Sequence, residues 1–394
     1  MTPKHSFPLS AETQFIAACC RWPHDAAAHA AVQQTISGIS DWNVLLDACR
    51  RHRVSGFVYN AIKQETGVPP EFRAQLKKDA LRAAVYANAQ AKETVRIETH
   101  MLENGINSIH FKGPALSQLA YGKLEIKQSN DLDMLVSAAD VPAAIEKLRD
   151  LNYRIKGAHY PIQPVLCDAL LRHRNQIELF SPQRMIVELH WQLSNAPGLL
   201  PNIEKDLSTQ QVALGPHGSV KTLGDTDLFV YLCQHGALHD WARLKWLVDV
   251  AAMFFSKGDS VTAPLMQAAH DKGAGLAATQ AQLLCHLLFA TPAPASIPQR
   301  TAQLSEHALR RIEAPYTRET LWEEICFNAG RWRVQRHFYP NSFAALGLLK
   351  VHRTSLSDII AMPLSARWDW LYPILRLPRW LIRSVNAKRS TRKT

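Results

Sequence analysis

The sequence predicts an α+β fold in which a small mixed sheet forms a core flanked by helical N- and C-terminal domains. Residues 10–104 have a helical pattern, and the stretch 80–103 is nearly free of Gly and Pro before Asn104-Gly105 ends it. Short apolar runs bounded by turn residues follow, which is typical of strands. After residue 220 the pattern is again helical, with Pro-rich breaks at 291–294 and around Pro363.

These changes of pattern divide the chain into four expected parts. They are a helical N-terminal domain (1–104), a mixed α+β domain (105–222), a helical C-terminal domain (223–375) and a basic tail (376–394). At 394 residues the chain is too long for one ordinary domain. A content of 47% hydrophobic and 20% charged residues is typical of a globular protein.

The first strand of the mixed domain, residues 106–111, is expected to lead into a helix at 114–121 through Lys112-Gly113. Pro114 suits the first helical position, where a missing N–H is tolerated. Gly113 lets a ligand approach the backbone, the helix N-terminus offers N–H groups and Lys112 adds a positive charge. This turn suits a triphosphate. The alternative is that Gly113 only makes the turn and Lys112 is solvated.

The next strand, residues 131–136, carries two acids two positions apart. Residues i and i+2 of a strand point to the same face, so Asp131 and Asp133 can converge on one or two hard cations. Leu132 and Met134 then share the opposite, apolar face.

A lone Asp-x-Asp pattern proves little, and the chain contains a second one. Asp225-Thr226-Asp227 precedes an apolar run, where Asp225 or Thr226 is expected to cap a helix with an acid in its first turn. Asp131 and Asp133 differ because they begin a strand behind a candidate phosphate-binding turn.

A hairpin is predicted from residues 175–180 and 185–191, which flank the turn Ser181-Pro182-Gln183-Arg184. Glu188 and His190 share one face of its second strand, so Glu188 is a candidate third carboxylate. Glu178 on the first strand is the alternative. Either glutamate could instead be an ordinary solvent-facing residue.

Taken in order, these motifs resemble the uncharacterised nucleotidyltransferases of the nucleotidyltransferase superfamily, which includes polymerase-β-like and kanamycin-nucleotidyltransferase-like enzymes. The resemblance spans roughly residues 80–255 and its ordered combination is more specific than any single motif. It rests on Phe111-Lys112-Gly113, Leu119-Ala120-Tyr121-Gly122, Asp131-Leu132-Asp133-Met134-Leu135-Val136 and Val187-Glu188-Leu189-His190-Trp191, with a looser match over 234–249.

Two positions depart from the superfamily pattern. Lys127 stands four residues before Asp131, where we expect arginine, which keeps the charge but loses the planar fork. Lys112-Gly113 replaces the more usual glycine-serine turn. Phosphate contacts therefore cannot be transferred from better-known relatives.

The resemblance implies metal-dependent transfer of a nucleoside monophosphate from a nucleoside triphosphate such as ATP to an acceptor, with release of pyrophosphate. Asp131, Asp133 and Glu188 would be the catalytic and metal-binding residues, and Lys112, Gly113 and Lys127 would bind the nucleotide phosphates. Mg²⁺ suits an all-carboxylate site, with Mn²⁺ as the alternative. The acceptor could be a small molecule, a protein or RNA.

Further polar residues are expected to line the cleft or to form a buried polar network: His190 and, on an expected helix over 228–255, His235, His239, Arg243 and Asp249. The i, i+4 spacing of His235 and His239 can bind zinc. However, position 236 is Gly, where a zincin carries its general-base Glu, and no third ligand is evident.

The net charge of +11 suggests nucleic acid as a partner. The tail 376–394 holds seven basic residues and no acid, which leaves +4 on the rest of the chain. This tail could contact RNA or an anionic membrane surface. The alternative is a docked terminal segment with a frayed basic end.

Seven cysteines without a C-x-x-C pattern predict reduced thiols and a cytoplasmic location. No signal peptide and no transmembrane segment is expected, and the uncharged stretch 274–295 is predicted to be a buried helix. Two other functions stay open. One is a catalytically silent scaffold that binds a nucleotide or a partner, and the other is a toxin-like nucleotidyltransferase that modifies RNA.

Overall fold

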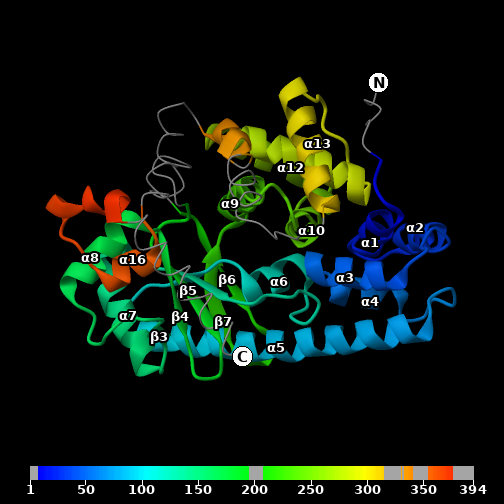
Figure 1. Cartoon of the computed structure of the whole chain (residues 1–394). Helices are drawn as coiled ribbons and strands as arrows, with labels where there is room; N and C mark the ends of the chain where they lie inside the picture. The colour runs from blue at the N-terminus through cyan, green and yellow to red at the C-terminus, as the bar shows by residue number, and fades with distance from the viewer. Residues whose placement is uncertain (1–7, 195–206, 315–329, 331, 340–353, 376–394) are drawn as a thin grey trace, which may run out of the picture. The chain divides into compact units, whose positions relative to one another are not determined.

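The computed structural model describes residues 8–194, 207–314, 330, 332–339 and 354–375 (Figure 1). The chain separates into two compact units, each built from segments distant in sequence. Unit 1 comprises residues 1–96, 109–132 and 200–339, and unit 2 comprises 97–108, 133–199 and 340–394. Helices dominate and the strands form small sheets, which confirms the predicted mixed α+β fold. The predicted domain boundaries stay a prediction.

Unit 1 begins with helices whose N-termini are capped by side chains. Ser10, Asp25 and Asp41 accept hydrogen bonds from backbone N–H groups in the first turns of the first three helices. A long unbroken helix follows and ends just before Asn104-Gly105, as predicted. These helices are α1 (Ala11–Cys19), α2 (Ala26–Ile36), α3 (Trp42–His52), α4 (Ser55–Ile62) and α5 (Pro70–Glu103), of which residues 70–96 belong to unit 1.

The strands of unit 1 hold helix α6 (Gly113–Tyr121) in place. β1 (Ile109–His110) precedes α6, and β6 (Thr209–Ala213) pairs antiparallel with β7 (Ser219–Leu223). The predicted strand 106–111 is therefore shorter than expected. α5, α6 and the hairpin share an apolar cluster formed by Ala91, Ala115, Leu124, Val212, Leu214 and Val220. This packing fixes the turn from which α6 starts.

The remaining helices of unit 1 correct one prediction. Residues 228–255 do not form a single helix but divide into α9 (Asp225–Leu238) and α10 (Leu244–Met253). Asp240 and Trp241 between them have φ values of 54° and 50°. The Trp241 ring is fully buried, and its Nε1 donates to Oε1 of Gln280 at 3.0 Å. Burial of this ring therefore overrides the local helix preference.

The start of α9 corrects a second prediction. Gly224, not Asp225 or Thr226, is the N-cap, and Asp225 and Asp227 both lie in the first turn. α9 and α10 pack against α12 (Gly275–Phe289), which is the buried helix predicted over 274–295 (Figure 1). Unit 1 is completed by α11 (Asp259–Asp271) and α13 (Gln299–Glu313).

No helix in the described ranges is both long and apolar enough to cross a membrane. The described cysteines are all buried and free of disulfides: Cys19, Cys20, Cys49, Cys167, Cys233 and Cys285. Cys326 and the basic tail 376–394 lie outside the described residues.

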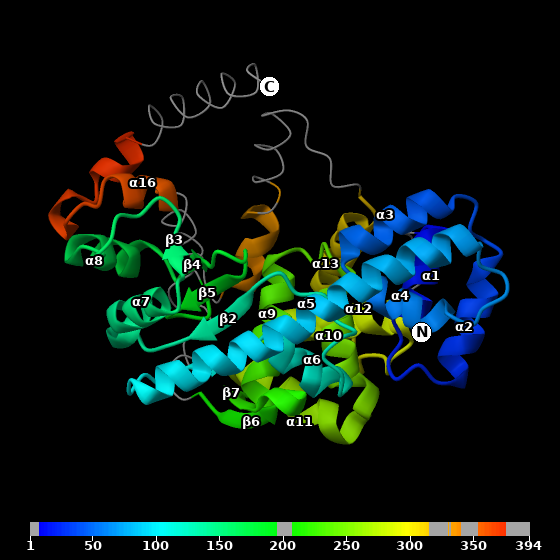
Figure 2. The same cartoon turned by 90° about the horizontal axis from the view of Figure 1, so that it is seen from below.

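Unit 2 contains the predicted hairpin. β4 (Gln176–Phe180) pairs antiparallel with β5 (Ile186–His190). β4 begins one residue later than expected, and β5 is one residue shorter than expected at each end. Within this unit the strands lie in the order β2, β5, β4, β3, where β2 is Leu132–Leu135 and β3 is Arg154–Ile155 (Figure 2). Asp131 and Val136 fall just outside β2, which is therefore shorter than the predicted strand 131–136. The helices of this region are α7 (Val141–Asp150) and α8 (Pro164–His173).

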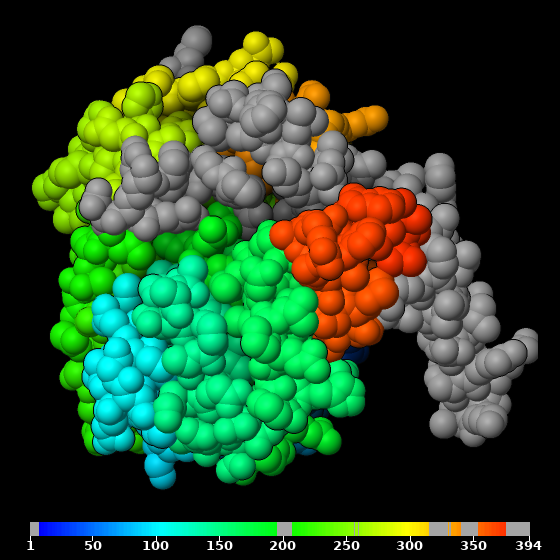
Figure 3. Space-filling view, turned by 90° about the vertical axis from the view of Figure 1, so that its left-hand side faces the viewer, coloured from blue at the N-terminus to red at the C-terminus, as the bar shows by residue number. Residues whose placement is uncertain are grey.

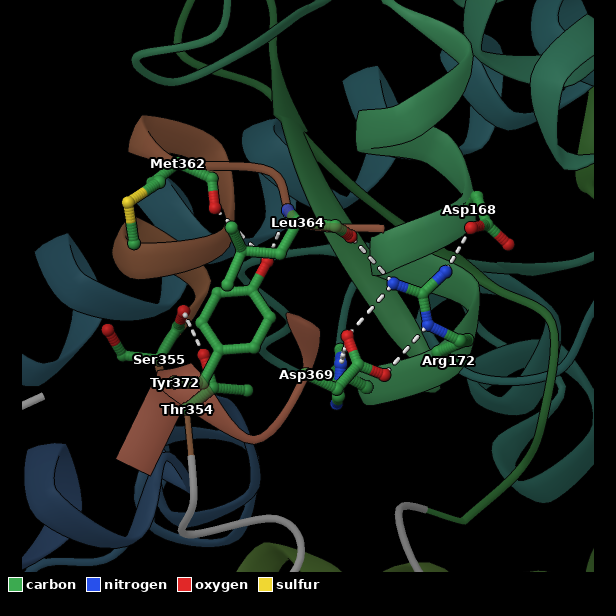
Figure 4. Close-up of polar contacts among 9 residues, drawn as sticks. Asp168, Arg172, Thr354, Ser355, Met362, Leu364, Asp369 and Tyr372 are labelled. Carbon is green, nitrogen blue, oxygen red and sulfur yellow. Dashed lines mark hydrogen bonds and ion pairs between the residues drawn. The ribbon is translucent and has the colours of Figure 1, made fainter. Parts of the chain in front are cut away.

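Residues 354–375, which include α16 (Leu356–Ala361), pack on α8 within unit 2 (Figure 3). The guanidinium of Arg172 donates to both carboxylate oxygens of Asp369 at 3.0 Å and to the Leu364 carbonyl at 2.7 Å (Figure 4). The Tyr372 hydroxyl accepts from the Leu364 N–H at 3.0 Å. A bidentate arginine contact is geometrically specific, so it fixes this segment on α8.

Candidate active site

Three predicted polar residues come together in unit 2. Asp133 lies on β2, and Glu188 and His190 lie on the neighbouring strand β5. His190 Nε2 is 3.3 Å from Oδ1 of Asp133 and 3.4 Å from Oε2 of Glu188. One ligand atom from each residue lies within 4.8 Å of the others. We call this group the acid–histidine cluster.

The alternation of β5 builds this cluster. Val187 and Leu189 are fully buried on one face, so Glu188 and His190 occupy the other, as predicted. The N–H of Val136 donates to the His190 carbonyl at 3.0 Å, which joins the end of β2 to β5. Trp191 Nε1 donates to the Arg174 carbonyl at 2.9 Å and anchors the end of the strand.

The donor set of the cluster fits a divalent cation. Asp133 is 3% exposed, and a buried carboxylate next to a second carboxylate is unfavourable unless positive charge offsets their repulsion. Two carboxylates and an imidazole suit a metal such as Mn²⁺ that accepts nitrogen as well as oxygen, whereas Mg²⁺ prefers oxygen ligands. Within the described residues this is the one group of three or more such ligands close enough to hold a metal.

The alternative carboxylate, Glu178, stands directly opposite Glu188 in the β4–β5 register. It is exposed and is not part of the cluster. Like charges directly opposite in an antiparallel pair destabilise a sheet. Glu178 therefore offers a natural matched control for Glu188.

The Lys112-Gly113 turn lies in unit 1 at the start of α6. Lys112 is the N-cap and Pro114 is the second helical residue, one position later than expected. Gly113 has φ +54°, and a Cβ there would lie 3.4 Å from the Asp131 carbonyl oxygen. Glycine is therefore favoured by the backbone conformation. Lys112 Nζ lies 5.4 Å from the centre of the Tyr231 ring, a cation–π distance.

Asp131 lies next to this turn and belongs to unit 1. In the sequence it precedes Asp133 by two residues. Its carbonyl accepts from Ser129 Oγ at 3.0 Å and from Gln90 Nε2 at 3.3 Å. Its Oδ1 accepts from Ser129 Oγ at 3.3 Å. These bonds fix the backbone of Asp131 beside the Lys112-Gly113 turn.

A buried polar network connects α6 to α10. The Tyr121 hydroxyl donates to Oδ1 of Asp249 at 2.7 Å, and the Lys127 ammonium pairs with Oδ2 of the same carboxylate. All three side chains are buried. Burial and the Asp249 charge raise the pKa of Tyr121, so its hydroxyl remains a donor. Lys127 thus already has a buried counter-ion.

The remaining predicted residues lie together in unit 1. The rings of His235 and His239 are 4.5 Å apart, and Trp246 packs against both. The Arg243 guanidinium is 5.9 Å from the centre of the Trp246 ring. In the described part of the chain no third metal-ligating side chain joins the two histidines. His235, His239 and Trp246 therefore form an aromatic group.

Arg53 and Lys245 were not predicted from the sequence. Burial, followed by the charges of Lys127 and Arg53, lowers the pKa of Lys245 to about 7, and burial lowers the pKa of Arg53. Lys245 is four residues before Asp249 on α10, a spacing that places both on one helix face and could have indicated it. Arg53 follows α3 and had no local signal.

These two regions, an acid–histidine cluster on a strand pair and a glycine turn opening a helix, define a candidate phosphoryl-transfer protein. The model of a family described as uncharacterised nucleotidyltransferases matches residues 39–290, which is more than half of the chain. The chain belongs to this family, as the sequence motifs predicted. No curated protein matches the chain.

Proposed function

We propose that the protein transfers a nucleoside monophosphate from a nucleoside triphosphate to an acceptor and releases pyrophosphate. The observation that carries this proposal is the acid–histidine cluster of Asp133, Glu188 and His190 in a member of a nucleotidyltransferase family. Two carboxylates and an imidazole on paired strands can hold a divalent cation. A cation held there could stabilise the negative charge of a phosphate group during its transfer.

Asp131, Asp133 and Glu188 are the proposed metal ligands, with Mg²⁺ or Mn²⁺ as the ion. A bound ion would neutralise charge on the phosphate oxygens. Glu188 is the more exposed of the two cluster carboxylates, so we assign it to accept the proton of the acceptor hydroxyl. His190, with its Nε2 between Asp133 and Glu188, positions both carboxylates.

Lys112 and the Gly113 N–H are the proposed contacts to the triphosphate. The left-handed conformation of Gly113 starts α6 without a side chain in the way of a ligand. Lys127 is proposed to add positive charge from its buried position beside Asp249. All of these residues lie within the predicted catalytic domain, residues 105–222, except Asp249.

The experiment is transfer of label from α-labelled ATP, GTP, CTP and UTP, with Mg²⁺ or Mn²⁺, to the protein itself, to bulk RNA and to a small-molecule extract. Wild type is compared with Glu188→Gln and with Glu178→Gln, its cross-strand neighbour. We expect wild type and Glu178→Gln to transfer label, and Glu188→Gln to lose about 100-fold or more, since it removes a charge aimed at the reacting groups.

The acceptor that takes label would name the substrate class. Equal transfer by wild type and Glu188→Gln would contradict the assigned site. Absence of label with every acceptor, despite nucleotide binding, would contradict the enzyme and favour a silent scaffold.

A further inference from the structure

Two tryptophans on the surface of unit 2 lie close together and are exposed. Trp368 is 43% exposed and Trp370 is 58% exposed, and the centres of their rings are 6.3 Å apart. Every other tryptophan whose burial the structure describes is buried or half-buried. Ile374, which is 59% exposed, follows Trp370 by four positions at the start of a helical segment, a spacing typical of one helix face. We call Trp368, Trp370 and Ile374 the exposed patch.

The segment that carries this patch is fixed by polar contacts. Asp369, between the two tryptophans in the sequence, accepts from the Arg172 guanidinium at 3.0 Å with both carboxylate oxygens (Figure 4). His173 Nε2 is 3.1 Å from Oδ1 of Asp369. The Tyr372 side chain is 1% exposed, and its hydroxyl donates to the Met362 carbonyl at 3.2 Å. A fixed segment that exposes several large apolar side chains together is typical of an interaction surface.

The charges near the patch favour an anionic partner. Arg367 is exposed, and its guanidinium lies 5.7 Å from the centre of the Trp368 ring, a cation–π distance. The sequence from 359 to 394 contains eight basic residues and one acid, Asp369. Seven of these basic residues belong to the stretch 376–394, outside the described residues. Asp369 is paired with Arg172, so its charge is balanced within unit 2. The complementary partner is therefore partly apolar and negatively charged.

A membrane surface fits this combination better than a nucleic acid does. Tryptophan is enriched at the boundary between lipid headgroups and acyl chains, because its ring is apolar and its N–H is polar. Arginine and lysine add attraction to anionic headgroups. A single-stranded nucleic acid would instead stack its bases on open ring faces. The Arg367 guanidinium lies over the Trp368 ring, the two tryptophan rings are tilted by 41°, and Ile374 has no ring for stacking.

We propose that the exposed patch is a docking surface for a membrane that contains anionic phospholipids. Trp368, Trp370 and Ile374 enter the headgroup region, and Arg367 contacts lipid phosphates. The basic stretch 376–394 adds positive charge to this contact. Docking of this kind does not require nucleotidyl transfer, so it is independent of the proposed function.

The test is sedimentation of the full chain with vesicles of phosphatidylcholine alone, or of phosphatidylcholine mixed with anionic phosphatidylglycerol. Wild type is compared with two double variants, one with Trp368→Ser and Trp370→Ser and one with Trp368→Phe and Trp370→Phe. Arg367→Gln and Ile374→Ser are tested singly. Leu81→Ser is the matched control for Ile374→Ser, because Leu81 on α5 is 55% exposed and also apolar. Far-UV circular dichroism checks that each variant is folded.

We expect wild type to bind the anionic vesicles and to bind phosphatidylcholine alone much more weakly. The double serine variant should lose about 10-fold or more of its partition coefficient, since the two rings supply most of the apolar area of the patch. The double phenylalanine variant should recover most of the binding. Arg367→Gln and Ile374→Ser should each lose about 5-fold, through one charge and one apolar side chain. Leu81→Ser should match wild type.

Wild type that stays in solution with anionic vesicles would overturn the docking surface. Equal binding by wild type and the folded double serine variant would do the same, as would equal binding to the two kinds of vesicle. Binding of a short single-stranded RNA that is lost in the double serine variant, without binding to vesicles, would assign the patch to nucleic acid instead.

Discussion

The two Asp-x-Asp motifs have the same spacing and different surroundings. Asp133 of the first lies beside Glu188 and His190 on paired strands. Asp227 of the second lies in the first turn of α9, where its Oδ2 accepts from Ser208 N–H at 2.6 Å and from Ser208 Oγ at 2.9 Å. Lys272 Nζ is 3.1 Å from the other oxygen of Asp227.

This difference separates a structural acid from a candidate metal ligand. A buried carboxylate surrounded by N–H, O–H and ammonium donors is satisfied by the protein itself. A buried carboxylate that shares its place with a second carboxylate and an imidazole belongs to a donor set that can hold a divalent cation. The neighbours of an acid, and not the spacing of a pair, therefore indicate its role.

The largest expected effect is that of Asp133→Asn. It should lower nucleotidyl transfer at least about 100-fold, because it removes a charge that would hold the cation at the reacting phosphate. It should also abolish any thermal stabilisation of the protein by Mn²⁺, since a ligand stabilises only the form it binds. Transfer rates and melting curves with and without Mn²⁺ measure both. If the variant kept half of the wild-type activity, Asp133 would not belong to the active site.

Asp227→Ala should act on stability instead. It leaves Lys272 and the Ser208 donors without their shared buried acceptor, which is expected to lower the free energy of unfolding by about 2–4 kcal/mol. Urea unfolding followed by circular dichroism measures this loss. Transfer per folded molecule should stay at the wild-type level. A selective loss of transfer with unchanged stability would mean that the second motif, too, belongs to the active site.

Asp225→Ala should have the smallest effect. Asp225 is exposed at the first position of α9 and accepts from Gln210 Nε2 at 2.8 Å. Loss of an exposed acid near a helix N-terminus is worth about 0.3–1 kcal/mol. The same urea titration, run beside Asp227→Ala, should therefore show a much smaller shift. An equal shift in the two variants would contradict the distinction between exposed and buried acids of one motif.

Local periodicity explains what could be predicted. Alternation along residues 185–191 placed Glu188 and His190 on one face, and that face carries the cluster. The turn before α6 was also predicted from a local signal, the adjacent residues Gly113 and Pro114. The participation of His190 beside both acids, rather than as a residue lining a cleft, needed the pairing of β5 with β2.

What could not be predicted depends on contacts between distant residues. The break between α9 and α10 exists because the Trp241 ring is buried against Gly236 and bonded to Gln280, a partner 39 residues away. The end of α3 and the start of α10 are joined by a bond between His52 and Leu244, residues 192 positions apart. No local sequence pattern encodes contacts between residues this far apart in the chain.

Helix α6 has the Lys112-Gly113 turn at one end and Tyr121 at the other. Nine residues of helix make a stiff rod about 13 Å long. Because Tyr121 is bonded to Asp249 at the far end of that rod, the turn takes its position from α10. A small displacement of α10 would therefore shift Lys112 and Gly113 through this helix.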